Sequence, residues 1–181
     1  MRLRTLLPSL LGLFALSFSA TAAQQPAMSD SDYMVKVATG APAPVVRNAT
    51  IMREGPNGTM RTLQTGTNGF TCMLVFDAPM CADHNAMLWA EALHAHTTPP
   101  SGSGMAYMLA GDSGTNNVDP YATGAHAHDH WVVQGPHIMI IAPDLAGMGY
   151  PMTADPDNTA PYVMWANTPY AHLMIPVSAS P

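Results

Sequence analysis

The chain is poor in basic residues. Only 6 of its 181 residues are Lys or Arg, against 12 Asp and Glu, and two of the six, Arg2 and Arg4, lie at the very N-terminus. A surface with so little positive charge repels phosphate backbones and anionic headgroups. The composition therefore excludes nucleic acid as an expected partner and gives no reason to expect binding to a membrane surface.

Long hydrophobic runs are absent beyond the N-terminal segment. The one extended apolar run, Leu6 to Phe18, follows the two arginines and precedes the small residues Ala20-Thr21-Ala22. It is shorter than the ~20 residues that a bilayer requires. This order predicts a secretory signal peptide over residues 1–23, cleaved near Ala22 or Ala23, and hence a periplasmic or secreted protein without membrane insertion. The mature chain would keep 181 − 23 = 158 residues and a formal charge of 4 − 12 = −8.

Cysteine is also scarce, with only Cys72 and Cys81. In an oxidising compartment an even pair predicts a disulfide bond. The alternative is a thiolate metal site, but the spacing is wider than the two to four residues typical of structural zinc sites.

Periodicity and turn residues predict a leader followed by one domain. Residues 24–44 are rich in Pro, Ala and Ser without a period, so we expect a flexible leader there and a single globular domain over 45–181. Asn57-Gly58 predicts a hairpin between 45–53 and 59–65. Further strands are expected over 70–76, 105–111, 130–134, 137–143, 162–167 and 170–177.

One amphipathic helix is expected over residues 83–96. Asp83 suits the N-cap, Pro99-Pro100 follows the end, and Ala86, Trp89, Ala90 and Leu93 fall on one side. Short strands with one helix predict an α+β or mainly-β fold, a single antiparallel sheet or barrel with the helix packed on it.

Signatures of common enzyme classes are missing. The sequence contains no G-x-S-x-G, no H-E-x-x-H, no phosphate-binding glycine loop and no dinucleotide fingerprint. An enzyme would have to use a metal or a histidine acid–base group. His137, which follows Gly135-Pro136 at the start of a predicted strand, is the first candidate for a catalytic base.

Histidine is abundant instead, with eight residues, three of them in GAHAHDHW (124–131). His126, His128 and His130, with Asp129, form a candidate metal site, zinc being suited to such ligands. A further ligand could come from Asp112, His94 or His96. The alternative is a solvated polar loop.

A second candidate lies on the predicted helix. There His84, Glu91 and His94 fall on the side opposite Trp89, and Glu91-x-x-His94 has the spacing used in carboxylate-bridged metal sites. A solvated polar face explains the same pattern.

Methionine stands beside histidine in two predicted strands. His137 is two residues before Met139, and His172 is two residues before Met174, so each pair shares a strand face. Imidazole and thioether together suit Cu(I), a metal that bacteria handle outside the cytoplasm. Both strands are apolar on their two faces, as fully buried strands are, and this pattern favours packing in a core over a metal site.

GTNGFTCM (66–73), PMC (79–81), GPHIMI (135–140) and TPYAHLMIPV (168–177) resemble a group of secreted bacterial proteins of similar size that have no assigned activity. The resemblance covers most of the mature chain and implies an exported single domain. It transfers no functional residue, and it favours the surroundings of His137 and His172 over the 126–130 tract.

Three functions fit these observations. The first is an exported small binding protein for a transition metal, copper or zinc, held by His, Met or Asp. The second is a secreted metal- or histidine-dependent enzyme that acts on a small molecule. The third is a structural or interaction domain without a site.

Overall fold

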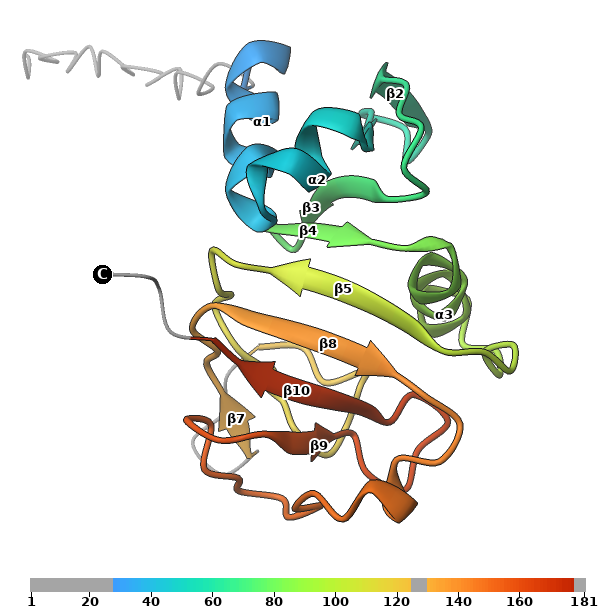
Figure 1. The fold of residues 1–181 in the computed structure, drawn as a ribbon, viewed down its shortest axis with the longest axis vertical. Coiled ribbons are helices and arrows are strands. Elements are labelled where there is room, and N and C mark those ends of the chain that lie inside the picture. Colours follow the sequence, from blue (N-terminus) through green and yellow to red (C-terminus); the bar gives the residue numbers. More distant parts are fainter. Residues whose placement is uncertain (1–27, 125–129, 178–181) are drawn as a thin grey trace, which may run out of the picture.

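The computed structural model describes residues 28–124 and 130–177. They form a large sheet with helices at its upper end and along one side (Figure 1). The predicted signal peptide, 1–23, and the cleavage site near Ala22 or Ala23 lie outside the described residues. In chain order the elements are α1 (Asp30–Val37), η1 (Ala38–Gly40), α2 (Ala43–Asn48), β1 (Thr50–Glu54), β2 (Met60–Gln64), β3 (Thr71–Val75), β4 (Ala78–Ala82), α3 (His84–His94), β5 (Gly104–Met108), β6 (Thr115–Asn116), β7 (Trp131–Val132), β8 (His137–Ile141), η2 (Ala146–Met148), β9 (Tyr162–Met164) and β10 (His172–Pro176).

The main sheet has eight strands in the order β2-β1-β3-β4-β5-β8-β10-β9, and β6 and β7 form a separate pair. The predicted α+β or mainly-β class with a packed helix is confirmed. The predicted single antiparallel sheet or barrel needs correction, because β3 pairs with β1 in parallel and the sheet is open. The reason is topological: β2 returns antiparallel to β1, so a third strand on the far side of β1 runs parallel to it.

The segment expected to be a flexible leader is helical where the structure describes it, so that expectation is wrong for residues 28–44. Ser29 caps α1 by accepting a hydrogen bond from the Asp32 amide. Tyr33 is buried, and its hydroxyl donates to Met52 O at 2.8 Å and accepts from Leu74 N at 3.0 Å. Packing against β1 and β3 therefore fixes a helix of only 8 residues, which is too short to show a clear amphipathic period in the sequence.

The predicted first hairpin is present but shorter than expected. Residues 45–48 belong to α2, which begins with prolines in its first turn, where no amide needs an intrahelical acceptor. β1 then pairs antiparallel with β2, and Gly58 has a φ of 73°, as predicted for the Asn57-Gly58 turn.

The disulfide between Cys72 and Cys81 is confirmed and joins paired positions of β3 and β4. The second of these strands was not predicted. β4 reads Ala-Pro-Met-Cys-Ala and is buried throughout, so it shows neither alternation nor β-branched residues.

The predicted helix over 83–96 is confirmed as α3. The Asp83 side chain accepts a hydrogen bond from the Ala86 amide at 2.9 Å and caps the helix. Ala86, Trp89 and Ala92 are buried, whereas Glu91 is exposed. The buried face is therefore turned slightly from the predicted one, because Ala92 replaces Leu93 at its centre.

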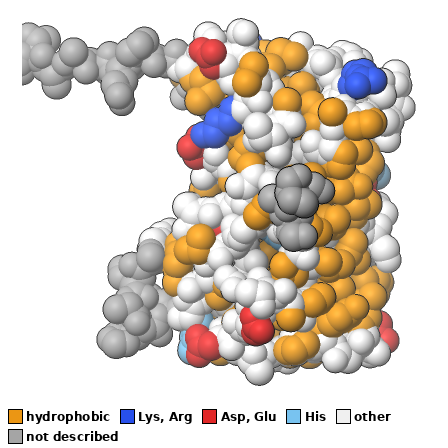
Figure 2. Space-filling model, turned by 60° about the vertical axis from the view of Figure 1, so that its left-hand side comes forward, with side chains coloured by type: hydrophobic (Ala, Val, Ile, Leu, Met, Phe, Trp, Pro, Cys, Tyr) orange, Lys and Arg blue, Asp and Glu red, His pale blue; other side chains and the backbone are white. Residues whose placement is uncertain are grey.

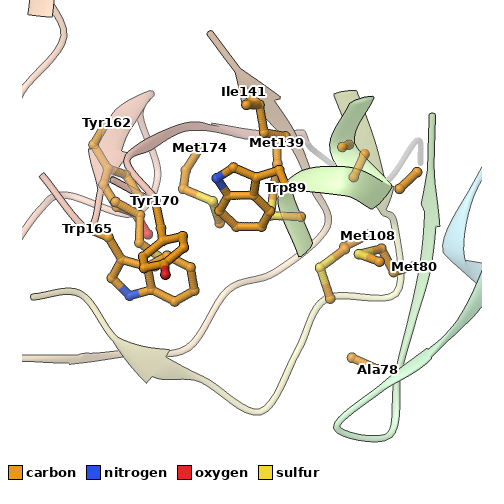
Figure 3. Close-up of a cluster of buried hydrophobic side chains, with 14 residues drawn as sticks. Ala78, Met80, Trp89, Met108, Met139, Ile141, Tyr162, Trp165, Tyr170 and Met174 are labelled. Atoms are coloured by element: carbon orange, nitrogen blue, oxygen red, sulfur yellow. The ribbon is translucent and has the colours of Figure 1, made fainter. Parts of the chain in front are cut away.

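The largest core cluster lies between one face of the sheet and α3. It joins Trp89 of the helix to Met80, Met108, Met139 and Met174 of four strands (Figure 3). A second cluster under α1 and α2 surrounds the disulfide. In the part of the chain that is described, no helix has the length and hydrophobicity to span a membrane. On the face of the molecule shown in Figure 2, hydrophobic side chains make up much of the surface, whereas Lys and Arg side chains are few.

Candidate functional site

A histidine and two methionines lie in one row across the central strands. In the pairing of β5 with β8, Met108 stands opposite His137. The β4–β5 register pairs Cys81 with Tyr107 and Ala82 with Ala106, and its continuation places Met80 beside Met108. Figure 3 shows these two methionines side by side. Opposed residues on one face have Cβ atoms about 4.5–5.5 Å apart, so Met108 lies next to both His137 and Met80, which are themselves two strands apart.

We call Met80, Met108 and His137 the soft-donor row. All three are buried, with exposed fractions of 5%, 7% and 0%. Sequence reasoning singled out His137 but missed both methionines, because their proximity arises from strand register and leaves no local spacing signal.

The tautomer of His137 follows from its one hydrogen bond. Nδ1 lies 2.8 Å from Gly135 O, and a carbonyl only accepts, so Nδ1 carries the proton. Burial lowers the pKa of His137, while the bond to Gly135 and the charge of Asp112 act in the opposite direction. The ring is therefore neutral at pH 7, and its Nε2 keeps a free lone pair.

That Nε2 atom has no hydrogen-bond partner among the described residues, although it is buried. A buried polar atom without a partner costs about 1–3 kcal/mol, so native structures rarely retain one without a role. Among the described residues, Asn117 Oδ1 and Trp89 Nε1 are the other buried side-chain atoms in this state.

His172 is held in a similar way one strand further along the sheet. Its Nδ1 donates to Tyr170 O at 3.0 Å, and its ring lies edge-on to Trp89 and Trp165, with centroids 5.0 Å away in each case. Burial lowers the pKa of His172 to about 4; the Tyr170 bond opposes this shift and the charge of His137 adds to it.

The predicted His-x-Met pairs do share the buried face. Met139 and Met174 stand opposite each other in the β8–β10 pairing, whereas His172 stands opposite Met164. Met139 and Met174 therefore lie between the soft-donor row and His172 in the sheet, and the two tryptophans occupy the surroundings of His172.

A cavity of about 300 Å³ lies beyond one end of the soft-donor row's strands β4 and β5, and Met80 and Met108 do not line it. Ala78, which lines it, is two residues from Met80 on the same face of β4, and Ala110 and Asp112 line it just after β5. Neither His137 nor His172 lines this cavity, which does not favour a direct acid–base role for either histidine.

Asp112 connects the cavity with the buried histidine. Its Oδ1 accepts hydrogen bonds from Gly114 N at 2.9 Å and Gln134 N at 3.1 Å, which fixes the carboxylate. Its negative charge opposes the burial that lowers the pKa of His137. For Tyr162, burial raises the pKa of the hydroxyl, and the charge of Asp112 raises it further.

The predicted His-rich site can be placed only in part. His126, His128 and Asp129 lie outside the described residues. His130 is at the surface, where its Nδ1 pairs with Asp155 Oδ1 at 2.7 Å. Within the ranges 28–124 and 130–177, no three His, Cys, Asp or Glu side chains gather into a group able to hold a metal.

The helical candidate, His84, Glu91 and His94, is on the solvent side of α3, where all three residues are exposed. The described structure does not bring them together with a further ligand. Their position agrees with the expectation of a solvated polar face.

The chain was compared with protein-family models, with curated proteins and with solved structures. No family model matches it, and no curated protein or solved structure shows a significant match.

Proposed function

We propose that the protein is an exported metal-binding protein that holds a soft ion, Cu(I), between the imidazole of His137 and the sulfurs of Met80 and Met108. The observation that carries this proposal is Nε2 of His137, a lone pair that is buried and without a hydrogen-bond partner in the described structure, on a side chain that stands opposite Met108 and in one row with Met80.

The donor set decides the class of metal. Neutral imidazole and thioether are soft ligands that select Cu(I) over harder cations. Both cysteines are bonded to each other, so no thiolate is available for a structural zinc site. The alternative zinc site depends on the 126–130 tract, of which the structure describes only His130.

The surroundings of His137 resemble those of a metal-binding histidine. Such a ligand usually donates its other ring N–H to a backbone carbonyl or carboxylate, which fixes the tautomer and orients the ring. The bond from His137 Nδ1 to Gly135 O supplies this support. Methionine has three rotatable bonds and adapts its sulfur position easily, so Met80 and Met108 can adjust to an ion without moving their strands.

Replacing Met108 by Leu is expected to weaken Cu(I) binding by about tenfold or more, since even supporting groups around a metal contribute 10–100-fold. Met-to-Leu nearly conserves volume, and the fold should lose less than about 1.5 kcal/mol. The measurement is an anaerobic titration of untagged protein with Cu(I) against a chromophoric competing chelator. Met80→Leu should behave in the same way.

Met164→Leu is the matched control. Met164 of β9 is buried like Met80 and Met108, but it stands opposite His172 of β10 and is not part of the soft-donor row. It should bind Cu(I) as the wild type does. The proposal fails if the wild type takes up no stoichiometric Cu(I), or if Met80→Leu/Met108→Leu binds as tightly as the wild type. Selective loss in Met164→Leu would move the site to His172.

A further inference from the structure

The cavity beyond the soft-donor row is bounded by an unusual hairpin tip. Phe76 and Asp77 connect β3 to β4 with φ values of 47° and 69°, and Phe76 is 95% exposed. Two-residue turns of this kind favour Asn-Gly, because a side chain in the left-handed region costs roughly 1–2 kcal/mol. Backbone strain of this kind gathers at functional sites, and Phe76 and Asp77 are both lining residues of the cavity.

Charged side chains of both signs line this cavity. Lys36 of α1 forms an ion pair with Asp77 of the hairpin tip, and Asp112 is a further lining residue. Lys36 thus neutralises Asp77, whereas the Asp112 carboxylate accepts hydrogen bonds only from neutral backbone amides in the described structure. The net field that a cation meets in the cavity comes mainly from Asp112.

Ala110 follows Met108 by two residues and stands opposite Ala78 when the β4–β5 register is continued, so the cavity wall lies one step along these strands from the soft-donor row. Along β4 the cavity wall at Ala78 leads directly to Met80, and the segment that carries Asp112 is hydrogen-bonded to the Gln134 backbone, three residues before His137.

We propose that this cavity is the access route by which the ion reaches His137, with Asp112 as the residue that draws the cation in and Lys36 as the charge that opposes it. The inference rests on the proposed function. Asp112 acts on the approach of the ion and is not one of its final ligands, so its removal should change the rate of uptake and leave the affinity unchanged.

The test uses Ag⁺ as a soft probe ion, added as silver nitrate in chloride-free buffer and followed by stopped-flow tryptophan fluorescence. Asp112→Asn keeps the Oδ1 acceptor and removes only the charge. We expect its association rate constant to fall roughly threefold or more at low ionic strength, as removal of an attractive charge at a focusing cleft does. Lys36→Met, which keeps the aliphatic stem, should accelerate association. Both differences should shrink as salt is added.

Asp144→Asn is the matched control, because the Asp144 carboxylate is exposed and also accepts a hydrogen bond from a backbone amide, Gly147 N. It should bind Ag⁺ at the wild-type rate. An unchanged association rate in Asp112→Asn overturns the access route and leaves the metal site standing. If Asp112→Asn binds Ag⁺ less tightly only because the ion dissociates faster, Asp112 is a ligand of the ion, and the access route is overturned as well. If the wild type shows no saturable Ag⁺ binding, both the route and the proposed function fall.

Discussion

Replacing Trp89 by Ala is expected to lower the free energy of unfolding by about 3–5 kcal/mol, the range for truncation of a large buried aromatic side chain. Trp89 is 5% exposed and joins α3 to the sheet; its ring is stacked on that of Trp165, with centroids 5.9 Å apart, and lies edge-on to His172, with centroids 5.0 Å apart. The truncation would leave a cavity between the helix and four strands. Urea denaturation followed by circular dichroism measures the loss.

The control is Glu91→Ala, two residues further along the same helix. Glu91 is exposed and forms no ion pair in the described structure, so its replacement should change stability by less than about 0.5 kcal/mol. A large loss for Glu91→Ala together with a small loss for Trp89→Ala would mean that α3 packs on the sheet through its other face.

The second large effect is a loss of stability in mild acid. The pKa of His172 is lowered by burial to about 4, whereas an unfolded histidine titrates near 6.5. Between these values the unfolded state binds more protons than the folded state, so stability falls as the pH falls. We expect the metal-free protein to lose about 2–3 kcal/mol between pH 7.5 and 4.5, measured as the free energy of unfolding in urea.

The other groups with a lowered pKa do not reverse the direction of this change of stability with pH. The pKa of His137 is also lowered by burial, and the opposing influence of Asp112 only reduces that shift. Asp30, whose pKa the bond to Arg61 lowers to about 2, loses its proton well below this window. His172→Phe should flatten the pH dependence, and the exposed His84→Gln should not. If the free energy of unfolding falls with pH as steeply in His172→Phe as in the wild type, His172 is not the group responsible.

Much of the fold could be predicted from local signals. Asp83 and the prolines after 98 bound one helix, Asn57-Gly58 marks one hairpin, and the chain's two cysteines pair with each other. The first two depend on residues close in sequence, and the third depends on there being only two cysteines. Helix α1 and strand β4 could not be predicted, because 8 residues are too few to show a clear helical period and uniform burial removes the alternation of a strand.

In the candidate site, too, some residues could be predicted from local spacing and others could not. His137 was singled out by its position at the start of a strand, and Met139, His172 and Met174 by their spacing. Met80 and Met108 reach His137 only through the register of three strands, two of which are separated from each other by α3. The sheet order that brings β8 beside β5 is a tertiary outcome with no counterpart in local spacing.

The most direct test of the metal site is X-ray absorption at the copper edge on protein loaded anaerobically with one equivalent of Cu(I). We predict a first shell of sulfur with one imidazole nitrogen, in a protein that has no free cysteine to supply that sulfur. The sulfur contribution should fall in Met108→Leu and disappear in Met80→Leu/Met108→Leu. A first shell made only of nitrogen and oxygen, the same in the wild type and the double variant, would contradict the account.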